Sequence, residues 1–507
     1  MSRWQVQPVI YEVNTVVWLR ELGGRYGRPV TLGDVPDEVW DDLAMPGLDA
    51  VWLMGVWERS PAGLRVAQAN EELRRSWGRA LPDVRPEDVV GSPYCVRRYV
   101  VDAALGGPAG LAAARTALAR RGVRLLLDYV PNHVAPDHPW VTDHPEYFIR
   151  GHRGDLERTP PEFIEAAGAV LALGRDPYIA PWPDVVQLNA FAPELREATA
   201  AVLADIGRQC DGVRCDMAML LMNDVFARTW SQRAGPVPAD DFWPLVLERV
   251  RRLRPDMLFV AEAYWDLEWA LQQHGFDYCY DKRLYDRLLH ESAAGVRAHL
   301  GAEVAYQRHL LRFLENHDEP RAAATMPPEK QRTAAVTIAT LPGATLWHEG
   351  QFEGRRVRPP VFLARRPDEP ADGELRAFYR ELVDAVHSAG LREGEWRLLD
   401  TAGWADNPTH EHLVAWCWEG ANRHLVIVNL SDQPAQGRVL LPWDDLRGRR
   451  WQLAELVGDA GYQRDGTEMA ESGLFVALDP WQWHLVSVRE EAPVAAGAGR
   501  SERRRGR

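Results

Sequence analysis

Ionisable and amide side chains follow four short apolar runs of this 507-residue chain. They are Asp128, Asn132 and His133 after the first run, Arg214 and Asp216 after the second, Glu262 after the third, and Asn316, His317 and Asp318 after the fourth. Two carboxyl groups that flank a glycosidic bond can cleave it, because one protonates the leaving oxygen while the other attacks the anomeric carbon or activates water. The pattern therefore indicates glycoside chemistry, provided that the fold brings Asp216, Glu262 and Asp318 together.

The sequence around two of these acids predicts different roles for them. Arg214 and Asp216 are two positions apart, so on a strand both side chains point to the same side. A neighbouring guanidinium keeps a carboxylate ionised, as a nucleophile requires. Glu262 lies in an apolar segment, 257–265, which raises a carboxyl pKa and suits a general acid. Each motif alone also fits a structural ion pair or a strand end, so the hypothesis depends on the whole set.

Eight apolar runs are predicted to be the β-strands that position these residues. They begin at Val9, Asp49, Val123, Gly212, Met257, Asp277, Leu311 and Ala344. Helical patterns occupy 107–122, 193–209, 242–253 and 373–390, between or after these runs. Strands that alternate with helices predict an α/β fold, a (β/α)8 TIM barrel, whose catalytic groups lie at the C-terminal ends of the strands.

The other parts of the sequence do not follow the strand–helix alternation. Residues 134–190 are rich in Pro, Asp and Gly and predict a small inserted subdomain after the third strand, so that the catalytic barrel comprises 1–133 and 191–390. Short apolar runs separated by turn residues in 391–489 predict a C-terminal antiparallel β-sandwich domain. The low-complexity segment 490–507 is expected to be a disordered tail.

Composition excludes several classes of protein. The chain has 59 Lys and Arg against 73 Asp and Glu, and a net charge of −14 disfavours binding to nucleic acid or to an anionic membrane. No run approaches the roughly 18 apolar residues of a transmembrane helix, and the N-terminus has no secretory signal pattern. The five cysteines form no CxxC pair, which favours reduced thiols and a cytoplasmic location.

The four motifs together resemble the conserved regions of the alpha-amylase superfamily, glycoside hydrolase family 13. DYVPNH (128–133), GVRCDMA (212–218), AEAYW (261–265) and ENHDEPR (315–321) stand in the order of that family, and the resemblance covers 9–488. It implies that Asp216 is the nucleophile of a retaining double displacement, that Glu262 is the acid/base, and that Asp318 stabilises an oxocarbenium-like transition state. It also implies substrate-binding roles for Tyr99, which would stack on the sugar, and for Asp128, His133, Arg214, His317 and Arg321.

Several positions depart from the pattern of this family. Met219 and Leu220 replace a Lys-His pair that shapes the acceptor side in many alpha-amylases. Asn132 stands at the usual calcium ligand, but Gln187 replaces the acid of a PDLN-like signature, and no acidic partner for Asn132 is evident. We therefore expect no required cofactor, and Asn132 is the one candidate ligand for Ca²⁺.

The sequence as a whole predicts a retaining glycoside hydrolase that acts on α-glucosidic bonds of α-glucans or maltooligosaccharides. An α-glucan transglycosylase or isomerase, or a phosphorolytic enzyme, is the alternative, because these enzymes share the covalent intermediate and differ in the acceptor. A catalytically inactive, amylase-like binding protein is less favoured, since all three acids are present. The expected partner is a carbohydrate, and the sequence assigns no oligomeric state.

Overall fold

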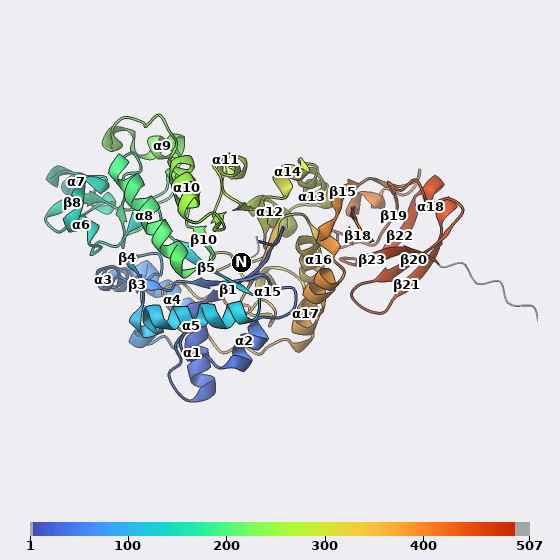
Figure 1. Cartoon of the computed structure of the whole chain (residues 1–507), viewed down its shortest axis with the longest axis horizontal. Helices are drawn as coiled ribbons and strands as arrows, with labels where there is room; N and C mark the ends of the chain where they lie inside the picture. The colour runs from blue at the N-terminus through green and yellow to red at the C-terminus, as the bar shows by residue number, and fades with distance from the viewer. Residues whose placement is uncertain (1–3, 492–507) are drawn as a thin grey trace, which may run out of the picture. The chain divides into compact units, whose positions relative to one another are not determined.

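The chain folds as two compact units, divided after Ser388, in a computed structural model that describes residues 4–491 (Figure 1). The first unit therefore ends two residues before the boundary at 390 expected from the sequence. Most of the tail expected to be disordered, from residue 492 onward, lies outside the described residues.

Eight parallel strands close into a barrel in the first unit. Around the barrel they are β1 (Val9–Asn14), β2 (Ala50–Met54), β5 (Arg124–Tyr129), β10 (Gly212–Cys215), β11 (Leu258–Ala261), β12 (Tyr278–Tyr280), β13 (Leu310–Arg312) and β14 (Ala344–His348), which pairs with β1 again. Each of the eight predicted strands is one of these, so the (β/α)8 fold is confirmed.

The first strand is shorter than the apolar run that predicts it. The chain turns into α1 (Thr15–Tyr26) directly after Asn14, because the side-chain oxygen of Asn14 accepts the backbone N–H of Val17 and caps the helix. Apolar residues after Asn14 therefore lie on the inner face of a helix, with Val17, Leu19 and others buried.

Helices surround the barrel and cover its strands. The predicted helical segments form α5 (Gly107–Arg120), α8 (Pro193–Gln209), α10 (Phe242–Leu253) and α17 (Gly373–Ser388). Figure 1 shows α5 and α8 outside the strands, with β1, β5 and β10 between them. Outside the inserted segment, this unit also contains α2 (Asp37–Leu43), α3 (Pro61–Ala69), α4 (Glu71–Ala80), α9 (Asn223–Ala234), α11 (Glu268–Gln273), α12 (Lys282–His290), α13 (Ala293–Leu300), α14 (Val304–Gln307), α15 (Ala322–Thr325) and α16 (Pro328–Thr340).

The barrel interior is apolar along most of its length and polar where the strands end. Its core includes Ile10, Trp52, Leu126, Val260, Tyr280, Leu311 and Leu346. Burial on both faces explains why these strands read as continuous apolar runs rather than as alternating patterns. Polar residues at or just after the strand ends are nevertheless buried, among them Glu12, Asp128, Arg214 and Glu262, and burial is costly unless such groups are paired.

An inserted subdomain lies between β5 and α8. At its base β6 (His133–Val134) pairs antiparallel with β9 (Val186–Gln187), and β7 (Phe163–Ala166) forms a hairpin with β8 (Ala169–Ala172). Short helices α6 (Trp140–Asp143) and α7 (Arg153–Arg158) complete it, and Figure 1 shows them grouped with β8. Its apolar cluster includes Val134, Val141, Tyr147, Phe148, Leu171 and Leu188. A separate small hairpin, β3 (Trp57–Arg59) with β4 (Val96–Val101), follows β2.

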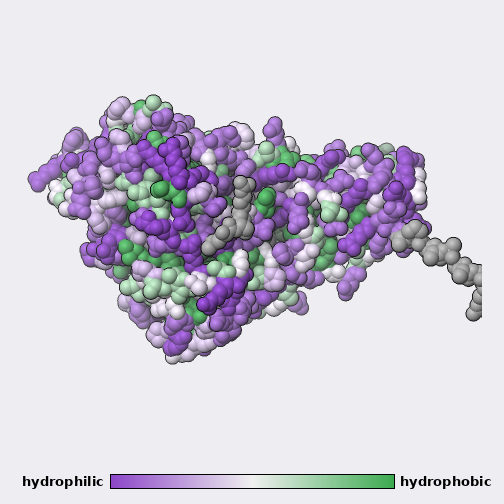
Figure 2. Space-filling view, viewed as in Figure 1, coloured by the Kyte–Doolittle hydropathy of each residue, from purple (hydrophilic) through white to green (hydrophobic). Residues whose placement is uncertain are grey.

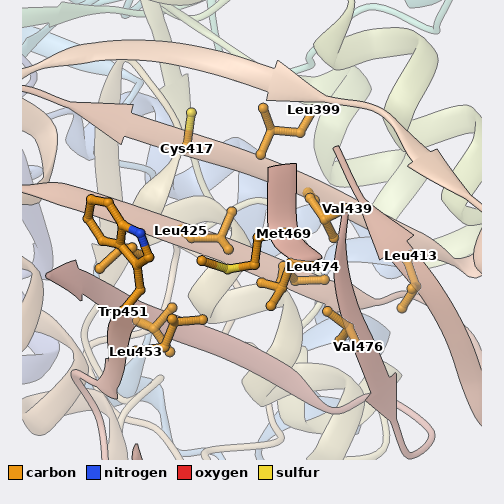
Figure 3. Packing of buried hydrophobic residues seen from close by; sticks show 14 of the residues in the cluster. Leu399, Leu413, Cys417, Leu425, Val439, Trp451, Leu453, Met469, Leu474 and Val476 are labelled. Atoms are coloured by element: carbon orange, nitrogen blue, oxygen red, sulfur yellow. The ribbon is translucent and has the colours of Figure 1, made fainter. Parts of the chain in front are cut away.

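The second unit contains two antiparallel sheets, as the sequence predicts. One sheet orders β15 (Glu395–Leu399), β17 (Leu413–Glu419), β18 (Arg423–Asn429), β23 (Trp483–Glu490), β20 (Arg450–Glu455) and β21 (Gly461–Asp465). The other orders β16 (Thr401–Ala402), β19 (Ala435–Val439) and β22 (Leu474–Leu478), and α18 (Gly466–Ser472) precedes β22. Side chains from both sheets, such as Leu425 and Val476, pack into one apolar cluster (Figure 3).

The surface is mainly polar on the face that Figure 2 shows, where apolar residues form scattered patches among hydrophilic ones. Within residues 4–491, no helix is both long and apolar enough to span a membrane.

Candidate active site

A single buried arginine connects the two principal acids at the C-terminal end of the barrel. Nη1 of Arg214, on β10, donates a hydrogen bond of 2.7 Å to Oδ1 of Asp216. Nη2 of the same guanidinium lies 2.8 Å from Oε2 of Glu262, which follows β11. The Arg214 side chain is only 1% exposed, so both contacts are shielded from water. The structure thus brings Arg214, Asp216 and Glu262 together, as glycoside chemistry requires.

Backbone contacts between neighbouring strands fix the two carboxyl groups. The N–H of Asp216 donates to the carbonyl oxygen of Tyr129 at 2.8 Å, and the N–H of Glu262 donates to that of Cys215 at 3.0 Å. Met217 then adopts a left-handed conformation with φ 43°, and its N–H donates to Oε2 of Glu262 at 2.6 Å. A positive φ at a non-glycine residue is strained, and such residues cluster at functional sites.

The third acid is held by a histidine relay. Oδ2 of Asp318 lies 2.9 Å from Nε2 of His317, and Nδ1 of His317 lies 2.5 Å from Oε1 of Glu12, on β1. The hydroxyl of Tyr94 is hydrogen bonded to the same Nε2 at 2.7 Å, and its ring stacks on the imidazole. Asp318 is 44% exposed, whereas Glu12 is fully buried, so the relay runs from the barrel interior to its open end.

Electrostatic surroundings separate the pKa values of these groups. Burial raises the pKa of Glu262 to about 7, against the opposing charge of Arg214. Burial also raises the pKa of Asp216, more than the neighbouring Arg214 lowers it. The pKa of Asp318 is lowered although partial desolvation opposes this, chiefly by the charge of His317 and its hydrogen bond to the carboxylate. The pKa of His317 is raised despite burial, by the charges of Asp318 and Glu12. Acids with divergent pKa values can divide acid and base roles.

The third acid lies beside the other two, because the guanidinium of Arg214 is 5.3 Å from the centre of the Tyr94 ring, whose hydroxyl contacts His317. The charge of Asp318 raises the pKa of both Asp216 and Glu262, and the charge of Asp216 raises that of Glu262. The expectation that Arg214 keeps Asp216 ionised therefore leaves out burial and the neighbouring acids, which raise the pKa of Asp216. The sequence shows the adjacent arginine but not the burial that outweighs it.

Asp128 lies behind the arginine. Its Oδ2 accepts the N–H of Gly55 at 2.9 Å, and its Oδ1 is 3.8 Å from Nη1 of Arg214. The residue is buried, with a pKa that burial raises. This position supports Arg214 from the neighbouring strand rather than presenting a carboxylate at the exposed end of the site.

Two residues predicted to bind substrate, Tyr99 and Arg321, make contacts within the protein. The hydroxyl of Tyr99 is hydrogen bonded to both the carbonyl and the N–H of Val130, and its ring packs against Trp57 and Tyr129, so Tyr94 takes the place beside His317. Strand β4 contains Tyr99, whereas Tyr94 precedes it, and the sequence alone does not show which ring faces the barrel.

Arg321 is the second of these residues. It is buried, forms an ion pair of 2.6 Å with Glu315, and donates to the carbonyl oxygen of Glu349 at 2.8 Å. These contacts connect the segment after β13 to the segment after β14. Arg321 therefore stabilises the loops around the site, and its substrate-binding role stays a prediction.

His133 lies at the base of the inserted subdomain. It is buried, its ring centroid is 5.1 Å from that of Trp182, and its Nδ1 is 3.3 Å from the side-chain nitrogen of Asn132. Burial lowers the pKa of His133 to about 4, so the ring is neutral near pH 7. A neutral, buried imidazole is suited to fixing the insert at this position.

The residues around Asn132 do not fit a calcium ion. Nε2 of Gln187 donates to the backbone and side-chain oxygens of Asn132, both at 2.9 Å, and to the carbonyl oxygen of Leu188 at 3.0 Å. Calcium prefers six to eight oxygen ligands, usually with carboxylates among them, whereas here three oxygens already surround an amide nitrogen. Within residues 4–491, no group of three or more His, Cys, Asp or Glu is arranged to hold a metal.

Comparisons with known proteins identify relatives of this chain. No family model matches it. Alpha-amylase MalA of Haloarcula japonica is 24% identical over 453 residues, which cover 85% of this chain and 56% of that protein. An alpha-1,4-glucan:maltose-1-phosphate maltosyltransferase of Rhodospirillum rubrum is 27% identical over 254 residues, or 48% of this chain and 30% of that protein. The aligned part of this chain thus spans about half or less of the length of these relatives.

Solved structures agree with the fold. The maltogenic alpha-amylase AmyB of Thermotoga neapolitana has a TM-score of 0.66 at 19% identity, covering 95% of this chain and 98% of that one. An alpha-amylase of Geobacillus thermoleovorans, complexed with acarbose, has a TM-score of 0.65 at 18% identity, covering 97% and 100%. A curated alpha-amylase is thus a relative of this chain, and the two solved alpha-amylases share its fold.

Proposed function

We propose that this relative of the alpha-amylases is a retaining glycosidase that cleaves α-glucosidic bonds in α-glucans or maltooligosaccharides. The observation that carries the proposal is the fully buried guanidinium of Arg214, which contacts Asp216 and Glu262 together. One guanidinium keeps the nearest oxygens of the two carboxyl groups within about 8 Å, which is close enough for both acids to act on one glycosidic bond. Retention is proposed from the resemblance of the four motifs, and the anomer of the first product tests it.

The proposed reaction begins with the two acids in opposite protonation states. Glu262, with a pKa of about 7, gives its proton to the glycosidic oxygen as the bond to the anomeric carbon breaks. A carboxylate oxygen of Asp216 bonds to that carbon and forms a glycosyl ester. Glu262 then accepts a proton from water, the resulting hydroxide equivalent attacks the anomeric carbon, and Asp216 leaves as carboxylate.

The third acid and its relay stabilise the charge that develops on the sugar. Asp318 has a lowered pKa, so it is a carboxylate at neutral pH and can accept hydrogen bonds from sugar hydroxyls. His317, kept cationic by Glu12 and Asp318, uses both ring nitrogens in the relay and so holds the Asp318 carboxylate in place. Tyr94 contributes a ring and a hydroxyl at the same position, and aromatic faces suit the C–H surfaces of sugars.

Glycosyl transfer to a sugar is the second candidate function. Met219 and Leu220, at positions where a Lys-His pair is expected on the acceptor side, are both buried. The acceptor side therefore lacks the polar groups that these two positions would otherwise provide. The maltosyltransferase of Rhodospirillum rubrum is a relative of this chain, which also supports keeping transfer open.

A single assay tests the proposal. The wild-type protein is incubated with maltotetraose, and products and their anomers are followed by chromatography and proton NMR. We expect shorter maltooligosaccharides that first appear as the α-anomer, and longer ones if transfer occurs. Asp216→Asn should reduce turnover by at least about a thousandfold. A β-anomer as the first product, or unchanged turnover of Asp216→Asn, would contradict the proposal, and binding without turnover by the wild type would favour the inactive relative.

A further inference from the structure

Two aromatic side chains of the second unit meet on its surface. Trp404 lies in the loop after β16, and Phe475 lies on β22. Their ring centroids are 6.3 Å apart and the ring planes are inclined by 33°. Trp404 is 43% exposed and Phe475 is 42% exposed, so a large part of both side chains remains in contact with water. Neighbouring apolar side chains that stay exposed indicate a binding surface, whereas single ones need no explanation.

The strand pattern places Phe475 on the outer face of the three-stranded sheet. Its neighbours on β22, Leu474 and Val476, point into the apolar cluster of this unit (Figure 3), so the side chain of Phe475 points to the opposite side. Arg438, on β19, is directly opposite Phe475 in the antiparallel register. The outer face of this sheet therefore presents an aromatic ring with a guanidinium beside it.

The loop that carries Trp404 is held in one conformation. The N–H of Asn407 donates to the carbonyl oxygen of Trp404 at 2.8 Å, and Nδ2 of Asn407 donates to the carbonyl oxygen of Gln436, on β19, at 3.0 Å. A Cβ atom at Gly403, directly before Trp404, would collide with the carbonyl oxygen of Asn407, so only glycine fits there. The backbone of Trp404 is therefore fixed before any ligand binds, which lowers the entropy cost of binding.

The charges on this face favour a neutral ligand. The guanidinium of Arg438 lies 4.0 Å from the carboxylate of Glu468, and both side chains are partly exposed, so the two charges compensate each other. A surface of this kind gives little attraction for a polyanion such as nucleic acid. The guanidinium still has several N–H groups that can donate to uncharged hydroxyl groups.

The exposed area of the aromatic pair is small. Aromatic side chains present about 150–250 Å² each when fully exposed, so two that are 42–43% exposed present about 200 Å² together. A stable interface between two protein molecules needs about 800 Å² from each partner. The pair is therefore of the size that contacts a short segment of a ligand, and it is too small for a stable dimer of this chain.

From these contacts we infer that Trp404 and Phe475 form a second carbohydrate site, which binds α-glucan polymer on the second unit. The choice of an α-glucan rests on the proposed function. Aromatic faces pack on the C–H surfaces of sugars, and two neighbouring rings can contact two neighbouring sugar units of one polymer chain. A polymer bound here has a raised local concentration near the acids of the first unit, whereas a short oligosaccharide gains nothing from a second site.

Native electrophoresis through gels that contain amylopectin measures this binding without requiring turnover. We expect amylopectin to retard the full-length wild type, and Trp404→Ala to raise the dissociation constant for amylopectin at least about tenfold. In kinetic assays, Trp404→Ala should lower kcat/KM for amylopectin at least about threefold, while kcat/KM for maltotetraose stays within about twofold. Phe475→Ala should show the same selective loss.

Matched variants distinguish this site from a general effect of removing an aromatic side chain. Trp269, an exposed tryptophan on α11 whose ring is inclined by 62° to that of Tyr306, provides the control. Trp269→Ala should leave both retardation and kcat/KM for amylopectin unchanged. Phe475→Tyr keeps a ring at the same position and should behave as wild type. The thermal midpoint of each variant shows that the second unit remains folded.

The inference is overturned if the wild type is not retarded, if Trp404→Ala is retarded as strongly as the wild type, or if it lowers kcat/KM equally for amylopectin and maltotetraose. A change from dimer to monomer in Trp404→Ala, with retardation unaltered, would assign the surface to a second copy of this chain and would also overturn it. Failure of the proposed function gives a separate result: a wild type that is retarded through Trp404 but does not turn over maltotetraose would contradict that function and support this inference.

Discussion

Replacing Arg214 by methionine should shift the pH profile of kcat/KM to higher pH. Turnover requires Asp216 as a carboxylate, which sets the acid limb, and Glu262 as an acid, which sets the alkaline limb near pH 7. Arg214 lowers the pKa of both groups. Removing its charge therefore raises both pKa values, so both limbs shift to higher pH and the loss of activity is greatest in acid.

The size of the shift follows from the contact geometry. A unit charge about 4 Å from a carboxylate is worth about 4 kcal/mol at an effective dielectric constant of 20. The charge of Arg214 is spread over the two nitrogens that contact the carboxyl groups, at 2.7 and 2.8 Å. Its interaction with each carboxylate is therefore worth about 2–3 kcal/mol. This corresponds to an increase of about 2 in each pKa. Because the two acids also lose a contact that positions them, the maximum of kcat/KM should fall by about a hundredfold or more.

The assay measures kcat/KM for maltotetraose between pH 4 and 9, together with the thermal midpoint of each variant. Arg214→Lys keeps a positive charge but cannot contact both carboxylates as the planar guanidinium does. The two limbs of its pH profile should therefore shift less than those of Arg214→Met. Arg312→Met removes another fully buried arginine, which pairs with Asp281 on the barrel, and should lower stability without moving either limb. A uniform loss at every pH in Arg214→Met would refute the electrostatic reasoning.

Two further predictions concern residues whose contacts the structure shows. Tyr94→Phe removes the hydroxyl that contacts His317 and should lower kcat/KM for maltotetraose about tenfold. Tyr99→Phe should lower the free energy of unfolding by about 1 kcal/mol in a denaturant titration, with little change in kcat/KM. Equal effects of the two variants on kcat/KM would contradict these roles. Chelation by EDTA should leave the thermal midpoint unchanged, because the side-chain amide of Gln187 already binds the oxygens of Asn132. Gln187→Ala should lower the free energy of unfolding by about 2–4 kcal/mol. A thermal midpoint that falls with EDTA would show a bound metal instead.

The sequence by itself determined the eight strands and the acids at their ends. Parallel strands buried on both faces require continuous apolar runs, and each such run is visible without any tertiary information. Closure of the barrel then brings the C-terminal ends of β10, β11 and β13 to one side, so Asp216, Glu262 and Asp318 had to share a site once the fold was correct. Spacing of two residues also placed Arg214 and Asp216 on the same face.

Only the tertiary structure decided which side chains surround those acids. Glu12 is the lone acid of an apolar run 305 residues before His317, and only the pairing of β1 with β14 closes the barrel and makes that contact possible. The path of the chain into β4 decides that Tyr94, and not Tyr99, contacts His317. Arg321 connects loops because it forms an ion pair with Glu315. Contacts of this kind arise from packing between distant segments, which local pattern and spacing do not encode.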